Sequence, residues 1–350
     1  MDSPSPRIRI SGPVRAKTWT RETGVVERLE ERLLVRDLVR IVFFVPSDHF
    51  QIAAGVSHAL DSYLRAVEGH PEALSRYTCC YWEPRGLGER GWELIRETLH
   101  PKERRYFDDY TPDEAFHPEK EGADPHFSLY ADDDRGYAFR YHARLPWREP
   151  PRNSVSVLQV TLPTEYLEER GADAVRALAL DMASRLPFSS GHAGLALASW
   201  FPVDEQWDRL RPVILRYPGF DIRDASIHDN LGTRVDGIHW LNFLGQPVLN
   251  ELGGASVLRA RFQCPPVTVQ ELEEERVVVT LGPSPEAGDL GQGQNLPAYR
   301  ELARVLEPWL EPFPWRLTHF TDPSVKEELW RWWRRFLDPS AAAHHGPTSA

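Results

Sequence analysis

The stretch LLVRDLVRIVFFV, residues 33–45, alternates apolar and polar side chains and then becomes continuously apolar. This pattern predicts a strand that enters a hydrophobic core. In the segment that follows, Ile52, Val56 and Leu60 recur at helical spacing, and Ser47 is a residue type that caps helices. The sequence therefore predicts a core strand followed directly by an amphipathic helix.

A second strand–helix unit lies further along the chain. SVSVLQVTL, residues 154–162, predicts a strand, and PTEYLEERGADAVRALALDMASRLP predicts a helix after it. The tripeptide VPS at 45–47 aligns with LPT at 162–164, which indicates a weak internal repeat. A chance match is the alternative, because a strand, a proline and a helix cap often follow one another.

The rest of the chain predicts more strands than helices. The predicted strands are RYTCCYWEP, GWELIRETL, GYAFRYHARL, HAGLALASW, ILRYPGFDI, GIHWLNFLG, ASVLRARFQC and RVVVTLGPSP. LPAYRELARVLEPWL and PSVKEELWRWWRRFL predict helices, the second with Asp322 as N-cap and Pro323 at its first position. We therefore predict an α+β fold with mixed, largely antiparallel sheets and a few packed helices. If the repeat is real, the fold consists of two related strand–helix halves.

These predictions divide the chain into four parts. Residues 1–32 form an N-terminal arm that adds an edge strand, and residues 33–150 form the first α+β half. Residues 151–337 form the second half with a C-terminal helix, and residues 338–350 form a disordered tail. The first half includes an irregular acidic excursion at residues 108–134.

Charge is distributed unevenly along the sequence. The formal net charge is -11, and residues 108–134 contain ten Asp or Glu and one Lys. Nucleic-acid binders concentrate Lys and Arg, so we expect no nucleic-acid partner. The acidic excursion is either a solvated loop or a docking surface for a basic, nuclease-like protein. The second interpretation names these partner-binding residues: Asp108, Asp109, Tyr110, Phe127, Tyr130, Asp132, Asp133 and Asp134.

The cysteines and the N-terminus indicate a cellular location. Cys79, Cys80 and Cys264 form no C-x-x-C pair, which predicts reduced thiols and neither a zinc ribbon nor a redox motif. The N-terminal residues lack the apolar segment of a signal peptide, and no apolar run is long enough to span a bilayer. We expect a cytoplasmic protein without a membrane partner.

The stretch SSGHAGLALASW, residues 189–200, is the strongest candidate for chemistry. A nucleophile elbow needs G-x-S-x-G on a strand-to-helix turn, and here the serines precede the first glycine. The small residues favour a tightly packed strand instead. The enzyme alternative is a hydrolase that uses His192 or His239 with Asp221 or Asp236.

A metal site is a further alternative for the same region. Its histidines and aspartates are His192, His228, His239, Asp221, Asp224, Asp229 and Asp236. None of them forms an H-x-H or H-E-x-x-H pair, which is the local spacing that metal ligation favours. The sequence therefore predicts neither a metal nor another cofactor.

Four segments carry a family resemblance when they are taken together. They are SSGHAGLAL, then RYPGFDI at 216–222, VDGIHWLNFLG at 235–245 and LGG at 252–254. Their order resembles the TsiV family, the type VI secretion immunity proteins named for VRR-type nuclease effectors. The resemblance runs from about residue 33 to residue 315.

The resemblance implies a function without catalysis. It implies a cytoplasmic protein that binds a cognate effector toxin and occludes its active or substrate site. It assigns no interface residues, because immunity interfaces vary with the toxin. The alternatives are the hydrolase described above and an interaction scaffold whose partner is not a toxin.

Overall fold

The computed structural model places most of the chain in one continuous fold. It describes residues 5–20, 24–71, 73–79, 84–100, 125–131, 136–144, 155–199, 207–223, 231–264, 267–273, 275–312 and 322–337. The strands are β1 (Arg9–Thr20), β2 (Gly24–Val45), β3 (Arg76–Cys79), β4 (Arg85–Gly86), β5 (His126–Tyr130), β6 (Ala138–His142), β7 (Ser156–Pro163), β8 (Ser190–Ser199), β9 (Leu241–Leu244), β10 (Val267–Leu272) and β11 (Arg276–Leu281). The helices are α1 (His49–Ala66), α2 (Glu89–Leu99), α4 (Thr164–Arg170), α5 (Ala172–Ala183), α6 (Trp207–Ile214), α7 (Val248–Glu251), α8 (Gly254–Ala260), α9 (Pro297–Leu306) and α10 (Pro323–Trp333), with short 3-10 turns η2 (Leu290–Gln292) and η3 (Glu307–Trp309).

All of these strands belong to one open antiparallel sheet. Its order is β10-β11-β9-β8-β2-β7-β6-β5-β3-β4, and β1 pairs with the N-terminal part of β2. The opening stretch of the sequence forms the central strand, because β2 pairs with β7 on one side and β8 on the other. The predicted α+β class with a largely antiparallel sheet is confirmed.

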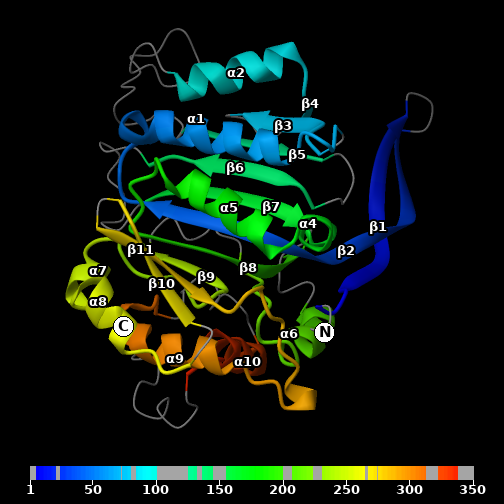
Figure 1. The fold of residues 1–350 in the computed structure, drawn as a ribbon. Coiled ribbons are helices and arrows are strands. Elements are labelled where there is room, and N and C mark those ends of the chain that lie inside the picture. The colour runs from blue at the N-terminus through cyan, green and yellow to red at the C-terminus, as the bar shows by residue number, and fades with distance from the viewer. Residues whose placement is uncertain are drawn as a thin grey trace.

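Helices α1 and α5 lie side by side across one face of this sheet (Figure 1). Alternate β2 residues such as Ile41 and Phe43 are fully buried in the core that also contains Ile52 and Val56 of α1. The opposite β2 residues Val42 and Phe44 belong to a separate cluster. A continuously apolar strand is therefore explained by burial on both of its faces.

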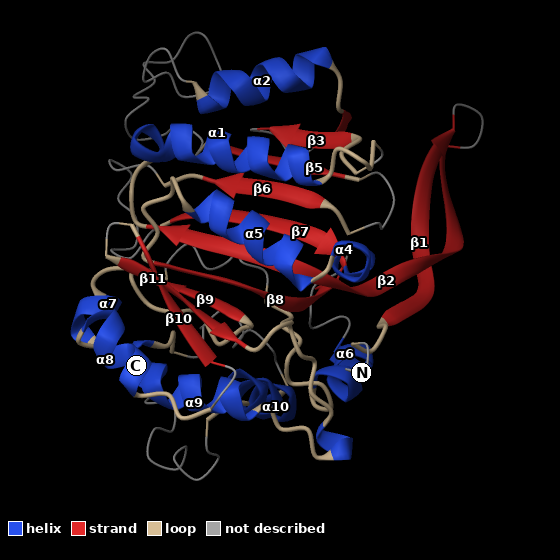
Figure 2. Ribbon diagram, viewed as in Figure 1, coloured by secondary structure: helices blue, strands red, loops and turns tan. Residues whose placement is uncertain are grey.

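The C-terminal helices cover the other end of the sheet. Figures 1 and 2 show α9 and α10 below β9, β10 and β11. Asp322 caps α10 by accepting a hydrogen bond from the Ser324 amide at 2.8 Å, and Pro323 is its first residue. Leu329 and Trp332 form the buried face of α10. The predicted start of this helix and its docking on the core are confirmed.

Several predicted strands are wrong. GWELIRETL forms α2, in which Gly91, Ile95 and Leu99 recur every fourth residue and are buried. ASVLRARFQC forms α8, and ILRYPGFDI begins at the end of α6 and continues as a turn. In α2 this spacing is a helical signal that the strand prediction overlooked, whereas α8 buries only Leu258 and shows little apolar pattern.

Two helix boundaries also differ from the prediction. The N-cap of α1 is Asp48 rather than Ser47, and the Asp48 amide donates to the Gln51 side chain at 3.0 Å. The second predicted helix is divided into α4 and α5 at Gly171, whose φ is +81°. A left-handed glycine ends one helix and changes the direction of the next.

The predicted halves share one sheet. The boundary near residue 150 lies outside the described residues, but β6 and β7 on either side of it are hydrogen-bonded neighbours. The two strands of the proposed repeat, β2 and β7, pair with each other at the centre. Outward from this centre, the other strands of the first half lie in the order β6, β5, β3, β4, and those of the second half lie in the order β8, β9, β11, β10. Chain order therefore runs largely inward in the first half and outward in the second. The tail, 338–350, lies outside the described residues.

Candidate functional site

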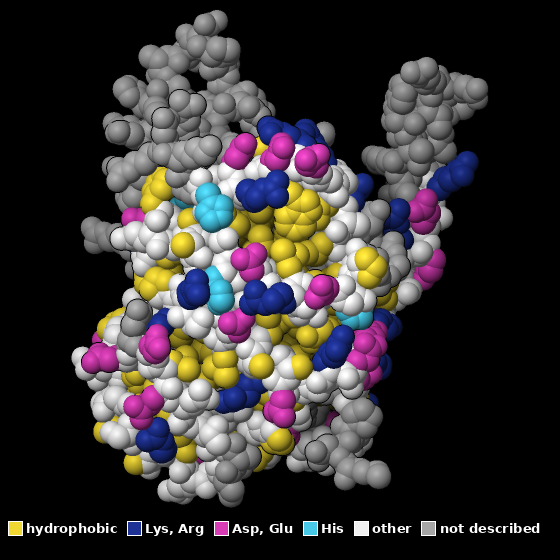
Figure 3. Space-filling model, turned by 45° about the horizontal axis from the view of Figure 1, so that its top comes forward, with side chains coloured by type: hydrophobic (Ala, Val, Ile, Leu, Met, Phe, Trp, Pro, Cys, Tyr) yellow, Lys and Arg dark blue, Asp and Glu magenta, His cyan; other side chains and the backbone are white. Residues whose placement is uncertain are grey.

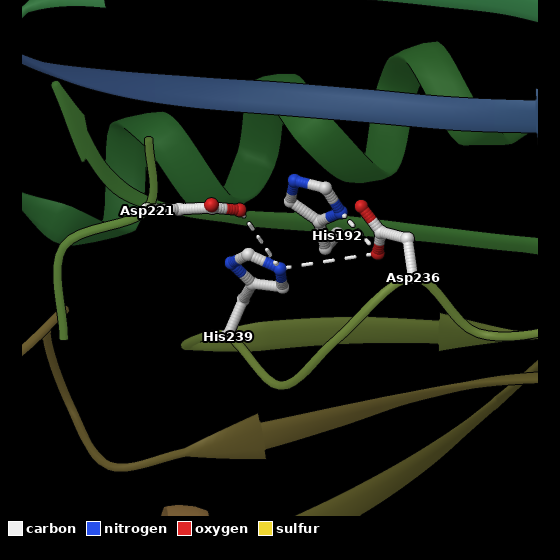
Figure 4. A group of neighbouring side chains, drawn as sticks. All are labelled: His192, Asp221, Asp236 and His239. Atoms are coloured by element: carbon white, nitrogen blue, oxygen red, sulfur yellow. Dashed lines mark hydrogen bonds and ion pairs between the residues drawn. The ribbon is translucent and has the colours of Figure 1, made fainter. Parts of the chain in front are cut away.

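Four of the candidate residues converge beneath the second face of the sheet (Figure 4). His192 Nδ1 lies 3.0 Å from Asp236 Oδ1, and His239 Nε2 lies 3.5 Å from Asp221 Oδ2. The two imidazole rings stack with centroids 3.6 Å apart. All four side chains are buried, and we call them together with Arg40 and Arg223 the ion network. His228, Asp224 and Asp229 lie outside the described residues.

Strand register brings His192 to this position. His192 on β8 is opposite Val42 on β2 and Asn242 on β9. The Asn242 side chain accepts from the His239 amide at 2.9 Å and donates to the His239 carbonyl at 2.6 Å. A side chain at Gly194 would place its Cβ 3.3 Å from the Cβ of His239. Residues 190–199 of SSGHAGLALASW thus form a packed strand, as predicted, and their small side chains leave room for the network.

Two arginines neutralise the buried carboxylates. Arg223 donates to both oxygens of Asp221, at distances of 2.7 to 2.9 Å, and its Nη1 lies 3.8 Å from Asp236. Arg40 Nη2 lies 2.8 Å from Asp221 Oδ2. Two cations therefore balance two anions, as buried charges require.

The hydrogen bonds also determine the imidazole tautomers. Arg223 Nη2 lies 2.8 Å from His239 Nε2, and a guanidinium only donates, so this nitrogen accepts and the proton is on Nδ1. His192 donates from Nδ1 to the Asp236 carboxylate, and its Nε2 has no hydrogen-bond partner among the described residues. Both rings are thus assigned as neutral.

The pKa shifts agree with this assignment. Burial lowers the pKa of His192 and holds that of His239 well below its ordinary value. Burial alone would raise the pKa of Asp221, but Arg223 and Arg40 outweigh it and hold the pKa well below the usual range. The pKa of Asp236 is likewise lowered despite burial, by the charge of Arg223 and by the hydrogen bond that His192 donates. At neutral pH the network contains two carboxylates, two guanidinium groups and two neutral imidazoles.

The same atoms do not fit a metal ion. One ligand atom from each of the four residues lies within 4.8 Å of the others, which is close enough for ligation. However, the imidazole rings are parallel to within 9°, so their in-plane lone pairs do not converge on one point between them. The guanidinium group of Arg223 already occupies the space that joins His239 to Asp221. The arrangement is therefore that of a buried ion-pair network.

Nor does the network contain a nucleophile beside a base. Ser190 Oγ donates to the Arg234 carbonyl at 2.8 Å, and Ser189 Oγ donates to the Phe44 carbonyl at 3.3 Å. A cavity of about 250 Å³ between α9 and α10 reaches Arg223 and Asp236. Both of those groups are already held in ion pairs. In the described part of the chain, the charged groups of this cluster are thus paired with one another.

Sequence reasoning missed the two arginines. Arg40 lies within the apolar stretch LVRIVFFV, and Arg223 directly follows the recognised segment RYPGFDI. A charged residue within a buried strand requires a partner, which is the signal that could have identified Arg40. The carboxylate that it contacts lies far away in sequence, and only the fold identifies it.

Most of the predicted interface lies outside the described residues: Asp108, Asp109, Tyr110, Asp132, Asp133 and Asp134. Phe127 is completely buried in β5, where its ring stacks on Phe139 at 5.8 Å and contacts Tyr141. Phe127 is thus a core residue in this structure. Tyr130, at the end of β5, is partly exposed.

The fold and the ion network define the class of the protein. This is an α+β protein with one open antiparallel sheet and a buried ion network against it. Within the described ranges, no helix is both long enough and apolar enough to cross a membrane.

The chain belongs to the TsiV family, described as "Type VI immunity for VRR-NUC", which matches residues 56–336. It is thus a member of a family of type VI immunity proteins, and the resemblance inferred from its four motifs is confirmed. The structure is similar to that of the Pseudomonas aeruginosa T6SS protein PA0821, with a TM-score of 0.68 and 18% sequence identity. That similarity covers 89% of this chain and 87% of the other, and it supports the fold. No curated protein matches the chain.

Proposed function

We propose that this chain binds a cognate type VI effector of the VRR nuclease kind and blocks its active or substrate site. The observation that carries this proposal is the family match over residues 56–336. The structure supports a role without catalysis, because His192, Asp221, Asp236 and His239 are buried and mutually paired. A nuclease that degrades DNA acts in the cytoplasm, so we place its inhibitor there.

The proposed contact is electrostatic and centres on the acidic excursion. A nuclease groove is basic because it binds phosphates, and carboxylates at residues 108–134 would occupy it in place of DNA. On the face drawn in Figure 3, acidic and basic side chains of the described residues are intermixed, so this face offers no patch of one sign. The proposed interface residues are Asp108, Asp109, Tyr110, Tyr130, Asp132, Asp133 and Asp134.

Protection sets a requirement on affinity. A delivered nuclease is harmful at a few copies, so its inhibitor needs nanomolar binding, which corresponds to about -12 kcal/mol. Interfaces of this strength commonly bury roughly 1,600 Å² and depend on a few anchoring side chains. Tyr110 and Tyr130 are the proposed aromatic anchors beside the carboxylates.

The test is co-expression with the nuclease effector encoded nearest to this gene, followed by co-purification and a DNA-degradation titration. Stoichiometric binding with loss of nuclease activity is the expected result. If neither binding nor protection occurs, the proposed function is wrong for that effector.

A second measurement tests the location of the interface. The triple variant Asp132→Asn, Asp133→Asn, Asp134→Asn should bind more weakly, and its affinity should depend less on salt. The matched control neutralises three exposed carboxylates on helices: Glu97→Gln, Glu169→Gln and Asp173→Asn. Equal affinity and equal salt dependence for both triple variants would place the interface elsewhere and leave the inhibitory function intact.

A further inference from the structure

The first two strands form a ribbon that projects from the body of the protein (Figures 1 and 2). From Ser11 to Thr20, β1 pairs with residues 24–33 of β2. The neighbouring strand β8 pairs with β2 only from Val35 onward, and β7 only from Leu38. We call residues 11–33 the arm, which is not the same range as the N-terminal arm predicted for residues 1–32. At about 3.3 Å per residue, the arm extends roughly 30 Å beyond the neighbouring strands of the sheet.

Ion pairs around the buried Asp37 and the partly exposed Glu165 hold the base of the arm. Asp37 has a side chain only 1% exposed, accepts from the Ile8 amide at 2.9 Å and contacts Arg9. Glu165 of α4 pairs with Arg9 at 2.7 Å and with Arg36 at 3.0 Å. These contacts therefore hold the base of the arm against the body.

Near its base the arm packs on the body, since Gly12 is buried and Val14 contacts the core, whereas the described side chains further out are mostly exposed. A two-stranded hairpin alone is marginally stable in water, and three strands or a packed face are needed for independent stability. Leu29 on the arm is 72% exposed, which is the highest value among the large apolar side chains that the described residues expose. In the described part of the chain, the outer edge of β1 pairs with no other strand. This edge offers backbone groups for one more strand.

The charges of β1 indicate which strand fits. Arg9 is already paired with Asp37 and Glu165. Apart from Arg9, β1 contains Arg15 and Lys17 and no acidic residue. Two copies of β1 paired edge to edge would bring like charges together, which is unfavourable. An extended segment with acidic side chains complements this edge instead.

We propose that the free edge of β1 binds an extended, acidic segment of the effector by strand addition. This inference rests on the proposed function and adds a second contact of opposite charge to it. The acidic excursion of this chain would contact the basic groove of the effector, and the basic edge of β1 would contact an acidic strand of the effector. Two contacts of opposite charge fix the orientation of the complex. The family match begins at residue 56, so the arm lies outside the matched region and is suited to selecting one effector among relatives.

The main test is hydrogen exchange of the full-length protein, free and bound to the co-purified effector. Strand addition should slow the exchange of amides in residues 11–20, while the amides of α2 exchange equally in both states. If a complex forms and the exchange of residues 11–20 is unchanged, the inference is overturned and the proposed function stands. If the free protein is a dimer with these amides already slow, a second copy covers the edge and the inference is again overturned.

A shortened arm tests the contribution to affinity. Deleting residues 15–18 and 26–29 removes four cross-strand pairs, spares the core contact of Val14, leaves residues 19–25 unchanged and preserves the alternation of faces. We expect the Kd for the effector to rise roughly tenfold or more, equivalent to about 1.4 kcal/mol. The charge variant Arg15→Glu/Lys17→Glu should do the same.

The control for this charge change is Arg90→Glu/Arg331→Glu, which alters two exposed arginines on α2 and α10. It should leave the Kd within about twofold, because such surface pairs contribute little. Unchanged affinity for both arm variants would overturn the inference, provided that the wild-type chain binds. Failure of the wild-type chain to bind would instead count against the proposed function.

Discussion

Replacing Arg223 by methionine should destabilise the protein strongly. The variant removes the cation that joins Asp221 to His239 and lies near Asp236, but it keeps an apolar stem beside Trp333. One partner cation, Arg40, remains for Asp221. The loss is therefore electrostatic rather than a loss of packing.

The structure sets the size of the effect. Removing one partner of a buried ion pair typically costs about 3 to 5 kcal/mol, because a charge remains in the interior without compensation. Arg223 is 5% exposed and Asp221 is 0% exposed, so water cannot replace the lost contacts. For a chain of this length, that cost corresponds to a Tm lower by about 4 to 7 °C.

The assay is urea unfolding followed by tryptophan fluorescence, with a thermal melt by circular dichroism. Arg331→Met is the control, because Arg331 and Glu327 are both mostly exposed and should contribute less than about 0.5 kcal/mol. The double variant Asp221→Asn/Arg223→Met should lose less than the sum of the two single variants. A change below about 1 kcal/mol for Arg223→Met would refute the claim that this ion network stabilises the fold.

Further predictions concern pH and close packing. Burial lowers the pKa of His192 and His239 in the folded state, so below about pH 6.5 the unfolded chain binds more protons than the folded one. Stability should therefore fall as the pH drops from 6.5 to 5, and His192→Asn/His239→Asn should flatten that slope in urea titrations; a slope equal to that of wild type would contradict the assignment of neutral imidazoles. Gly55→Ala on α1 would place a Cβ 2.3 Å from the Arg185 carbonyl oxygen, so it should cost about 1 to 3 kcal/mol in urea unfolding. Gly86→Ala has no atom within 4 Å of the new Cβ and should be close to neutral; equal losses for the two variants would show that α1 does not pack this closely.

Long elements with strong local patterns were predictable. The central strand contains a long apolar run, α1 has a clear apolar period, and α10 combines an apolar face with the predicted capping aspartate and proline. Such signals are local, because each residue is judged against neighbours within one or two turns. A short element such as α8, which buries only Leu258, contains too few turns for a period to develop, and tertiary packing decides its conformation.

The candidate site was only partly predictable. The sequence places His192, Asp221, Asp236 and His239 within one region, and the order of its motifs indicates the family. That these four side chains meet follows from the fold, since β8 and β9 align His192 with Asn242 and Asn242 holds His239.

By itself, the sequence determined the α+β class, the buried central strand, the acidic balance of the chain and the motifs of an immunity family. Only the tertiary structure decided that Arg40 neutralises Asp221, that Phe127 belongs to the core and that the arm leaves the sheet with an unpaired edge. The physical reason is the range of the interactions. Periodicity and capping act between near neighbours, whereas buried charges and strand edges are paired by the register of strands far apart in the chain.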